Sequence, residues 1–88
     1  MEGADWTARI DAIERAGQSR LGAVILMAAQ AGMAGDSRTF ARRFGVAHAL
    51  VLREAVILHE AGLLEALGPP DAPRRPLIPT ARGAALAD

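Results

Sequence analysis

The amino-acid sequence predicts one mainly helical domain with a small β-hairpin, an α+β fold, and three observations support this prediction. Apolar residues recur at helical spacing through residues 36–61, where two helices with a tight turn between them are expected. The run 21–29 is apolar almost all round, which is typical of a helix buried on most sides. Residues 63–78 carry several prolines between two short apolar stretches, which favours a stiff hairpin.

The first helix of the pair is expected to begin at Asp36 or Ser37. Either side chain can accept a hydrogen bond from a backbone N–H of the first turn, and such residues commonly start helices. Ala41 and Phe44 are expected on the inner face of this helix. Gly45 then ends it, because glycine adopts the left-handed conformation that a helix C-terminus commonly requires.

The second helix of the pair is expected from about residue 47 to 61. Val51, Ala55 and Leu58 recur at spacings of 4 and 3, which puts them on one face against the first helix. Gly62 is placed to end this second helix. Two helices joined by a short turn at a glycine form a helix-turn-helix in outline.

The N-terminal residues 1–19 are expected to form a separate short helix, and residues 20–88 the main domain. Trp6, Ile10 and Ile13 are spaced by 4 and 3, so they form one apolar stripe. Tryptophan is enriched both in cores and at interfaces, so two alternatives stay open. The stripe either covers the domain's own core or pairs with a second subunit.

The segment after the second helix is expected to form the hairpin. Its strands are predicted at 63–67 and 77–78, with a tip between them that holds Arg74 and Arg75. Proline stands at positions 69, 70, 73 and 76. Because proline cannot donate to a β-ladder, the strands should be short. Thr80 is then placed to cap a last helix, 81–87.

The order of these stretches resembles a known family. The helix end 53–64, the stretch 71–78 with its Arg74-Arg75 pair, and Thr80-Ala-Arg-Gly83-Ala-Ala-Leu86 follow one another as the recognition helix, wing and closing element do in winged helix-turn-helix transcription factors. The chain is most similar to regulators of the multiple-antibiotic-resistance (MarR) type, over residues 20–87. The resemblance implies a homodimer that binds double-stranded DNA.

The resemblance also implies which elements meet DNA. The recognition helix, about 47–61, would lie in the major groove, and the wing, about 65–79, on the backbone or in the minor groove. Carried over by position, the residues implied to contact DNA are Arg38, Arg42, Arg43, His48, Ala49, Leu52, Arg53, Arg74 and Arg75, with Ala47 and Val56 also on the base-facing side. Such a protein is expected to regulate transcription, as a repressor or a similar factor.

Each implied contact has a chemical basis. Arg53 is suited to a bidentate contact with guanine, and His48 can donate to a base or a phosphate. The arginines at 38, 42 and 43 can hold the backbone, and those at 74 and 75 can enter a minor groove. The alternatives are a solvated helix face for Arg42 and Arg43, and no role for His48.

Charge is distributed unevenly although the formal net charge is zero. Residues 36–58 hold four arginines against two acids, and residues 73–83 hold three arginines and no acid. By contrast, residues 59–72 hold three acids and no arginine. Local positive charge is what attracts a nucleic acid. The distribution therefore favours the helix-turn-helix and the wing as the nucleic-acid surface.

One feature departs from the family pattern. Recognition helices of this family usually offer polar side chains near their start, whereas this one offers Ala47, Ala49, Leu50 and Leu52. Apolar side chains contact thymine methyl groups but orient the helix poorly. Either specificity rests on few contacts plus DNA shape, or the helix face binds a protein. In the second alternative the chain is a protein-interaction module, with Leu50, Leu52 and Val56 as its apolar patch.

Other classes of function are disfavoured by what the sequence lacks. There is no cysteine, and the two histidines, His48 and His59, are too far apart to form a ligand pair on one helix. No nucleophile motif or phosphate loop is visible, so neither an enzyme nor a cofactor is expected. The run 21–29 is too short to span a bilayer, and no signal peptide is visible, so a cytoplasmic protein without membrane contact is expected. The sequence leaves a small-molecule effector open.

Overall fold

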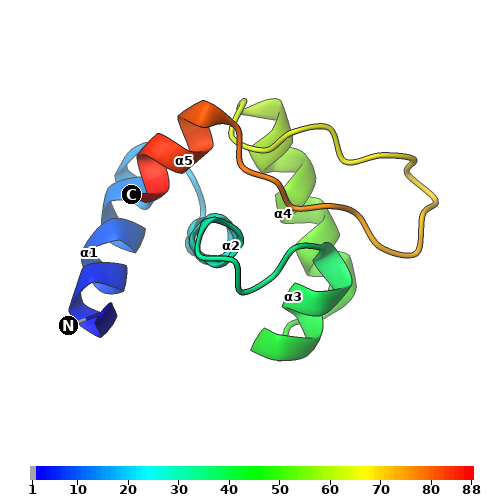
Figure 1. Ribbon diagram of the computed structural model, residues 1–88, viewed down its shortest axis with the longest axis horizontal. Helices are drawn as coiled ribbons and strands as arrows, with labels where there is room; N and C mark the ends of the chain where they lie inside the picture. The colour runs from blue at the N-terminus through cyan, green and yellow to red at the C-terminus, as the bar shows by residue number, and fades with distance from the viewer. Residues whose placement is uncertain (1) are drawn as a thin grey trace.

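Five helices make up the fold of the part that the computed structural model describes, residues 2–88, with side chains described from Trp6 onward. They are α1 (Glu2–Arg15), α2 (Arg20–Gln30), α3 (Ser37–Phe44), α4 (His48–Glu60) and α5 (Ala81–Ala87). Figure 1 shows α2 end-on at the centre, with α1 and α5 on one side and α3 and α4 on the other. Helix α2 packs against α1, α4 and α5, and α3 packs against α4.

The central position of α2 follows from its sequence. Ala23, Ile25, Leu26 and Ala28 are fully buried, because an apolar helix gains most when every side of it is covered. The prediction that this run forms a helix buried on most sides is therefore confirmed. None of the helices within residues 2–88 combines the length and the apolar character that crossing a lipid bilayer requires.

Three helices begin at a capping side chain. Ser19 caps α2, Asp36 caps α3 and Thr80 caps α5, each by accepting a backbone N–H two or three residues into the helix. Of the two candidates for the start of α3, Asp36 is therefore the cap, and Ser37 is instead fully buried. Helix α4 begins after Ala47, which supplies no side-chain cap.

The helix-turn-helix has the turn that was predicted. Gly45 lies in the left-handed region with φ 65° and ψ 36°, and its N–H bonds to the Ala41 carbonyl. Val51, Ala55 and Leu58 are fully buried in α4, as the spacing predicts.

On α3, the centre of the inner face is Phe40. This residue is fully buried and stacks on the half-buried Phe44 with ring centroids 4.3 Å apart. Ala41 and Phe44, predicted on the inner face, flank it and are half-buried.

The predicted β-hairpin wing is wrong. Residues 63–80 form an extended loop, and within residues 2–88 there is no β-strand, only two isolated antiparallel bridges, Asp36↔Pro76 and Leu64↔Pro79. The fold is therefore all-α rather than α+β, and it is not a winged helix-turn-helix. The predicted first strand, 63–67, takes part in one bridge, Leu64↔Pro79, whose partner lies just past the predicted second strand, 77–78.

Two physical causes keep this pairing short. The returning segment divides its hydrogen bonds between two partners: the Leu77 N–H bonds to the Gly35 carbonyl, whereas the Glu65 N–H bonds to the Ile78 carbonyl. Both bridging residues on the returning side are prolines, which cannot donate the N–H that would extend a ladder. The returning segment therefore forms one isolated bridge with each of its two partners.

Helices α1 and α5 close the core from the other side. Ile13 is fully buried and Ile10 is 8% exposed, both within the core of this same chain, while Trp6 packs half-buried against it. Gly83 allows α5 to pack closely against Leu63, just past the end of α4. A Cβ added at position 83 would collide with the Leu63 carbonyl oxygen. Glycine lowers the stability of a helix, and this close packing explains why glycine nevertheless occurs within α5.

Candidate nucleic-acid interface

The loop of residues 65–79, here called the proline loop, lies against the start of both α3 and α4. In Figure 1 it is the yellow and orange segment that leaves the end of α4, swings out, and returns past the helix-turn-helix to α5. Two backbone hydrogen bonds fasten the returning part: Ser37 N–H to the Arg75 carbonyl at 2.8 Å, and Leu77 N–H to the Gly35 carbonyl at 3.0 Å. The proline loop is therefore an ordered part of the helix-turn-helix surface.

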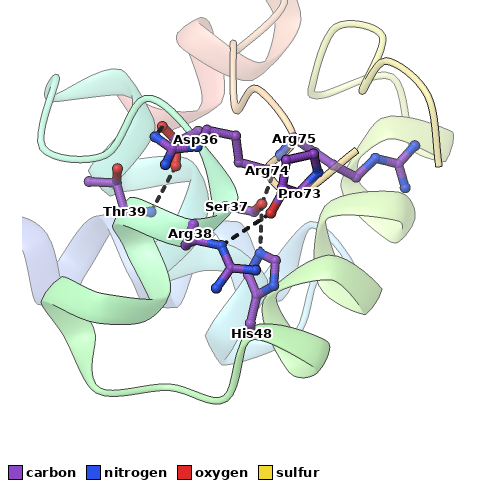
Figure 2. Close-up of polar contacts among 8 residues, drawn as sticks. All are labelled: Asp36, Ser37, Arg38, Thr39, His48, Pro73, Arg74 and Arg75. Carbon is purple, nitrogen blue, oxygen red and sulfur yellow. Dashed lines mark hydrogen bonds and ion pairs between the residues drawn. The ribbon is translucent and has the colours of Figure 1, made fainter. Parts of the chain in front are cut away.

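Ser37 joins three segments through one hydroxyl group (Figure 2). Its Oγ accepts the backbone N–H of Arg75 at 2.9 Å and lies 2.9 Å from Nε2 of His48, the first residue of α4. Beside the bond it accepts from Arg75, the hydroxyl has one proton and a second lone pair, so it donates to His48 or accepts from it according to which ring nitrogen carries the proton. Ser37 thus ties the start of α3, the start of α4 and the proline loop together in a buried position.

Arg74 and Arg75 point in opposite directions, as Figure 2 shows. The guanidinium group of Arg74 reaches back to Asp36, with 3.5 Å between NH1 and Oδ2. The side chain of Arg75 stays within the proline loop, where Nε donates to the Leu67 carbonyl at 3.2 Å and NH2 donates to the Gly68 carbonyl at 3.1 Å. The two arginines, expected to act alike, therefore have different surroundings: Arg75 is half-buried and holds the proline loop, whereas Arg74 is 58% exposed.

The three arginines of α3 also differ. Arg38 donates from Nε to the Pro73 carbonyl at 3.2 Å, and Arg43 donates from NH1 to the Met33 carbonyl at 2.9 Å. Arg42 is exposed and makes no hydrogen bond or ion pair within the described residues. One of the three is therefore wholly available to a partner, and the other two each keep free nitrogen atoms beside a backbone contact.

On the outer face of α4 the long polar side chain is Arg53. It is 72% exposed, and its Nε lies 3.9 Å from Oε2 of Glu54, so this contact holds it weakly. Ala49 is exposed beside it, while Leu52 and Val56 are half-buried.

Glu54 is a residue of this region that the sequence analysis missed. It is 7% exposed in α4, and its Oε1 accepts a 2.7 Å hydrogen bond from the hydroxyl of Ser19, the cap of α2. Its position gave a signal: Glu54 follows Val51 by three and precedes Leu58 by four, which places it on the buried stripe of the helix.

The pKa of Asp36 lies below its ordinary value of 3.8. The chief cause is the hydrogen bond that its carboxylate accepts from the Thr39 backbone N–H. Partial burial opposes this effect, while the Thr39 hydroxyl and the Arg74 guanidinium group add to it. Asp36 is therefore held in its charged form beside Arg74.

The structure brings together four of the predicted site residues and leaves the others apart. Arg38, His48, Arg74 and Arg75 gather around the start of α3 (Figure 2), whereas the other five lie elsewhere on α3 and α4. Within the described residues, no group of three or more histidine, aspartate or glutamate side chains is placed to hold a metal ion.

The chain matches no family model, no curated protein and no solved structure at a significant level. A role for the arginines therefore has to follow from their own chemistry and surroundings.

Proposed function

We propose that this protein is a sequence-specific regulator of transcription that binds double-stranded DNA as a homodimer in the cytoplasm, in the manner of a repressor. The observation that carries the proposal is the exposed Arg53, midway along the outer face of α4 in a helix-turn-helix whose opposite face is buried. An exposed arginine in the second helix of this motif is suited to reading a base in the major groove. Helix α4 is then the recognition helix.

The guanidinium group of Arg53 has the freedom that base reading requires. Its contact with Glu54 is long, at 3.9 Å, and the Arg53 side chain is 72% exposed, so turning toward guanine O6 and N7 costs little. Arg42 and Arg74 are the arginines best placed for phosphate contacts, because one has no partner within residues 2–88 and the other has only an exposed ion pair. Arg75 is occupied inside the proline loop and is assigned a structural role.

The proposal changes the part given to His48. Its Nε2 is engaged with the buried Ser37 hydroxyl, so we assign it to positioning the start of α4 rather than to a base contact. Ala49 remains exposed for apolar contact with a thymine methyl group, whereas Leu52 and Val56 offer only part of their surface. Because only a few side chains of α4 are available to contact bases, we expect the sequence-dependent shape of DNA to contribute to specificity.

A homodimer is proposed because one helix with few reading groups specifies only a short half-site. Two copies related by two-fold symmetry would read half-sites about 34 Å apart, one turn of the duplex. The order of α2, α3, α4 and α5, with Thr80 and Gly83 in the last, is the part of the resemblance to MarR-type regulators that supports this proposal. The resemblance itself remains a prediction.

Duplex binding tests the proposal directly. The protein is incubated with a random duplex library, bound DNA is enriched over several rounds, and Kd is measured for the enriched site and for random duplex at several salt concentrations. We expect an enriched sequence with two-fold symmetry, and a logarithm of affinity that falls linearly with the logarithm of salt concentration. No measurable binding to any duplex at about 50 mM salt would exclude the proposal.

A second candidate function is a protein-interaction module. Leu50 and Ile57 are 45% and 42% exposed and stand seven residues apart, on one flank of α4. The patch expected from the sequence combined Leu50, Leu52 and Val56, but Leu50 is two residues from Leu52 and so lies on a different side of the helix, while Leu52 and Val56 are half-buried.

The two candidates make opposite predictions for substitutions on that flank. Leu50→Ala with Ile57→Ala should abolish association with a protein partner and leave duplex binding near normal if DNA binding uses Arg53, because alanine removes apolar surface without adding negative charge beside that arginine. Salt provides a further distinction, because apolar association does not weaken steeply as salt rises, whereas DNA binding does.

A further inference from the structure

We propose that Asp36 competes with DNA phosphate for Arg74, so that the start of α3 and the proline loop together form a phosphate-contact site whose affinity Asp36 sets. This inference rests on the proposed function and assigns to the interface a residue that carries the wrong charge for DNA. The two carboxylate oxygens of Asp36 then have different roles.

The two oxygens have different partners. Oδ1 accepts the Thr39 backbone N–H at 2.8 Å and thereby caps α3, whereas Oδ2 faces NH1 of Arg74 at 3.5 Å (Figure 2). An asparagine side chain caps a helix about as well as aspartate does. Asp36→Asn should therefore keep the cap while removing the charge that faces Arg74.

The ion pair orients Arg74 without holding it tightly. The side chain of Arg74 is 58% exposed, and the separation of 3.5 Å is long for a charge-assisted hydrogen bond. Exposed pairs of this kind contribute little to stability because water and salt screen them. A phosphate oxygen offers the guanidinium group an equivalent anionic partner, so exchange of Asp36 for phosphate costs little.

The surroundings of Arg74 suit a backbone phosphate. Arg38 donates to the carbonyl of Pro73, the residue just before Arg74, so the side chain of Arg38 and the backbone of Arg74 lie along the same contact between α3 and the proline loop. Asp36 is the acid that pairs with Arg74 there. When Arg74 turns to a phosphate, Arg38 keeps its contact with Pro73, and the charge of Asp36 is left without its partner.

Arg75, the next residue in the chain, differs from Arg74 in how firmly its side chain is held. Arg75 donates to two carbonyl oxygens of its own loop and is half-buried, so it cannot be released without loosening the proline loop. Arg74 has its ion pair with Asp36 and no carbonyl partner among the contacts of the described residues. The proposal therefore concerns Arg74 alone.

A double-mutant cycle tests the proposal with the full chain. Wild type, Asp36→Asn, Arg74→Ala and the double variant are titrated onto one random-sequence duplex, and fluorescence anisotropy gives Kd between about 50 and 200 mM salt. Asp36→Asn should tighten binding by up to about fivefold at the lowest salt, the most that an exposed ion pair can hold back. Its salt slope should be steeper by up to about one, because Asp36 no longer recruits a cation when Arg74 leaves it.

The Arg74→Ala background provides the decisive comparison. Asp36→Asn removes a negative charge, which strengthens DNA binding to some extent in any background. If Asp36 and phosphate compete for Arg74, most of the gain in affinity depends on Arg74, so in the Arg74→Ala background the gain from Asp36→Asn should fall below about twofold. An equal gain in both backgrounds, or no gain in either, overturns the inference while leaving DNA binding itself intact. If wild type binds no duplex, the proposed function fails and this inference fails with it.

The fold of the variants is checked separately. Asp36→Asn should fold and unfold cooperatively because the cap is retained, and its unfolding temperature should be only slightly below that of wild type because the favourable charge of Asp36 is lost. Should Asp36→Asn fail to fold, Asp36→Ser replaces it in the cycle, since serine also caps α3 and carries no charge. The same coupling with Arg74→Ala is then required, and its absence overturns the inference.

Discussion

The hydroxyl of Ser19 donates a 2.7 Å hydrogen bond to the carboxylate of Glu54, and so joins the first turn of α2 to the middle of α4. The same Ser19 oxygen accepts the Gly22 backbone N–H at 2.9 Å, which caps α2. The carboxylate of Glu54 thereby lies near a helix N-terminus, where negative charge is favourable. A buried acid in α4 is thus tied to the central helix of the core.

Ser19→Ala should lower the free energy of unfolding by about 2 kcal/mol, because it removes a cap and leaves one oxygen of a buried carboxylate without its donor. Urea unfolding of wild type, Ser19→Ala, Glu54→Ala and the double variant measures the coupling between them. We expect the double variant to lose less than the sum of the two single losses. Strict additivity would show that the two side chains do not stabilise each other.

Gly83→Ala should destabilise the protein by about 1–3 kcal/mol, because the added methyl group would meet the Leu63 carbonyl oxygen and the Leu26 side chain. Helix propensity alone predicts the reverse, a gain of about 1 kcal/mol. The sign of the change in thermal or urea unfolding therefore decides between packing and propensity. Ala85→Gly, at an exposed position of the same helix, is the matched control and should lose about 1 kcal/mol.

Arg75→Ala should lower the free energy of unfolding by about 1–2 kcal/mol, because its guanidinium group bonds two carbonyl oxygens of the proline loop. Arg74→Ala should change it by less than about 0.5 kcal/mol, since only an exposed ion pair is lost. On DNA Arg74→Ala should have the larger effect of the two, weakening binding to every sequence, and it should make the salt slope shallower by less than about one, because in wild type Asp36 takes up a cation when Arg74 leaves it. Equal losses of stability in both variants would contradict the different roles assigned to these two arginines.

The stability advantage of wild type over Asp36→Asn should depend on pH. The pKa of Asp36 is lowered in the folded protein, chiefly by the hydrogen bond from the Thr39 backbone N–H, so folding favours the charged carboxylate. This contribution is fully present above the unfolded value of about 3.8 and is lost as the pH falls through the lower, folded value. Urea unfolding of both proteins at a series of pH values measures the difference, which should be constant near neutral pH and shrink below about pH 4. A difference that stays constant down to about pH 3 would contradict this reasoning.

Arg53→Ala should weaken binding to the enriched DNA site by about 1–3 kcal/mol and relax the preference at one base pair in each half-site, with little loss on random duplex. Arg42→Ala is the matched control, because an arginine that contacts only phosphate contributes equally to every sequence. Kd values on the enriched site and on random duplex measure both effects. If Arg53→Ala lost affinity equally on both, Arg53 would be a phosphate contact and the base reading would lie elsewhere.

Local patterns were sufficient to predict the helices and how they end. The spacing of Val51, Ala55 and Leu58 predicts a face that is fully buried, and Gly45 ends α3 in the left-handed conformation expected of it. Thr80 caps α5 as its position indicates. These features depend on residues within one or two turns of each other, which is why the sequence displays them.

The partners of the arginines could not be predicted in the same way. Arg38 bonds to Pro73, Arg74 pairs with Asp36, and the Ser37 hydroxyl holds Arg75, all across about 35 residues or more of chain. Charge counts along the sequence treat these arginines as equivalent. Their different exposure arises only when the proline loop returns to the start of α3.

The sequence by itself thus determined the presence of five helices, the cap of α5, the choice of Asp36 or Ser37 as the cap of α3, and the buried faces of α2 and α4, because hydrophobic periodicity and capping are local. Only the tertiary structure decided that the expected hairpin is a loop, since Leu77 bonds to Gly35 while Ile78 bonds to Glu65. A segment that divides its hydrogen bonds between two distant partners, with proline at both bridging positions, cannot build a ladder with either of them. That division of backbone hydrogen bonds places Arg74 at Asp36 and so shapes the candidate interface.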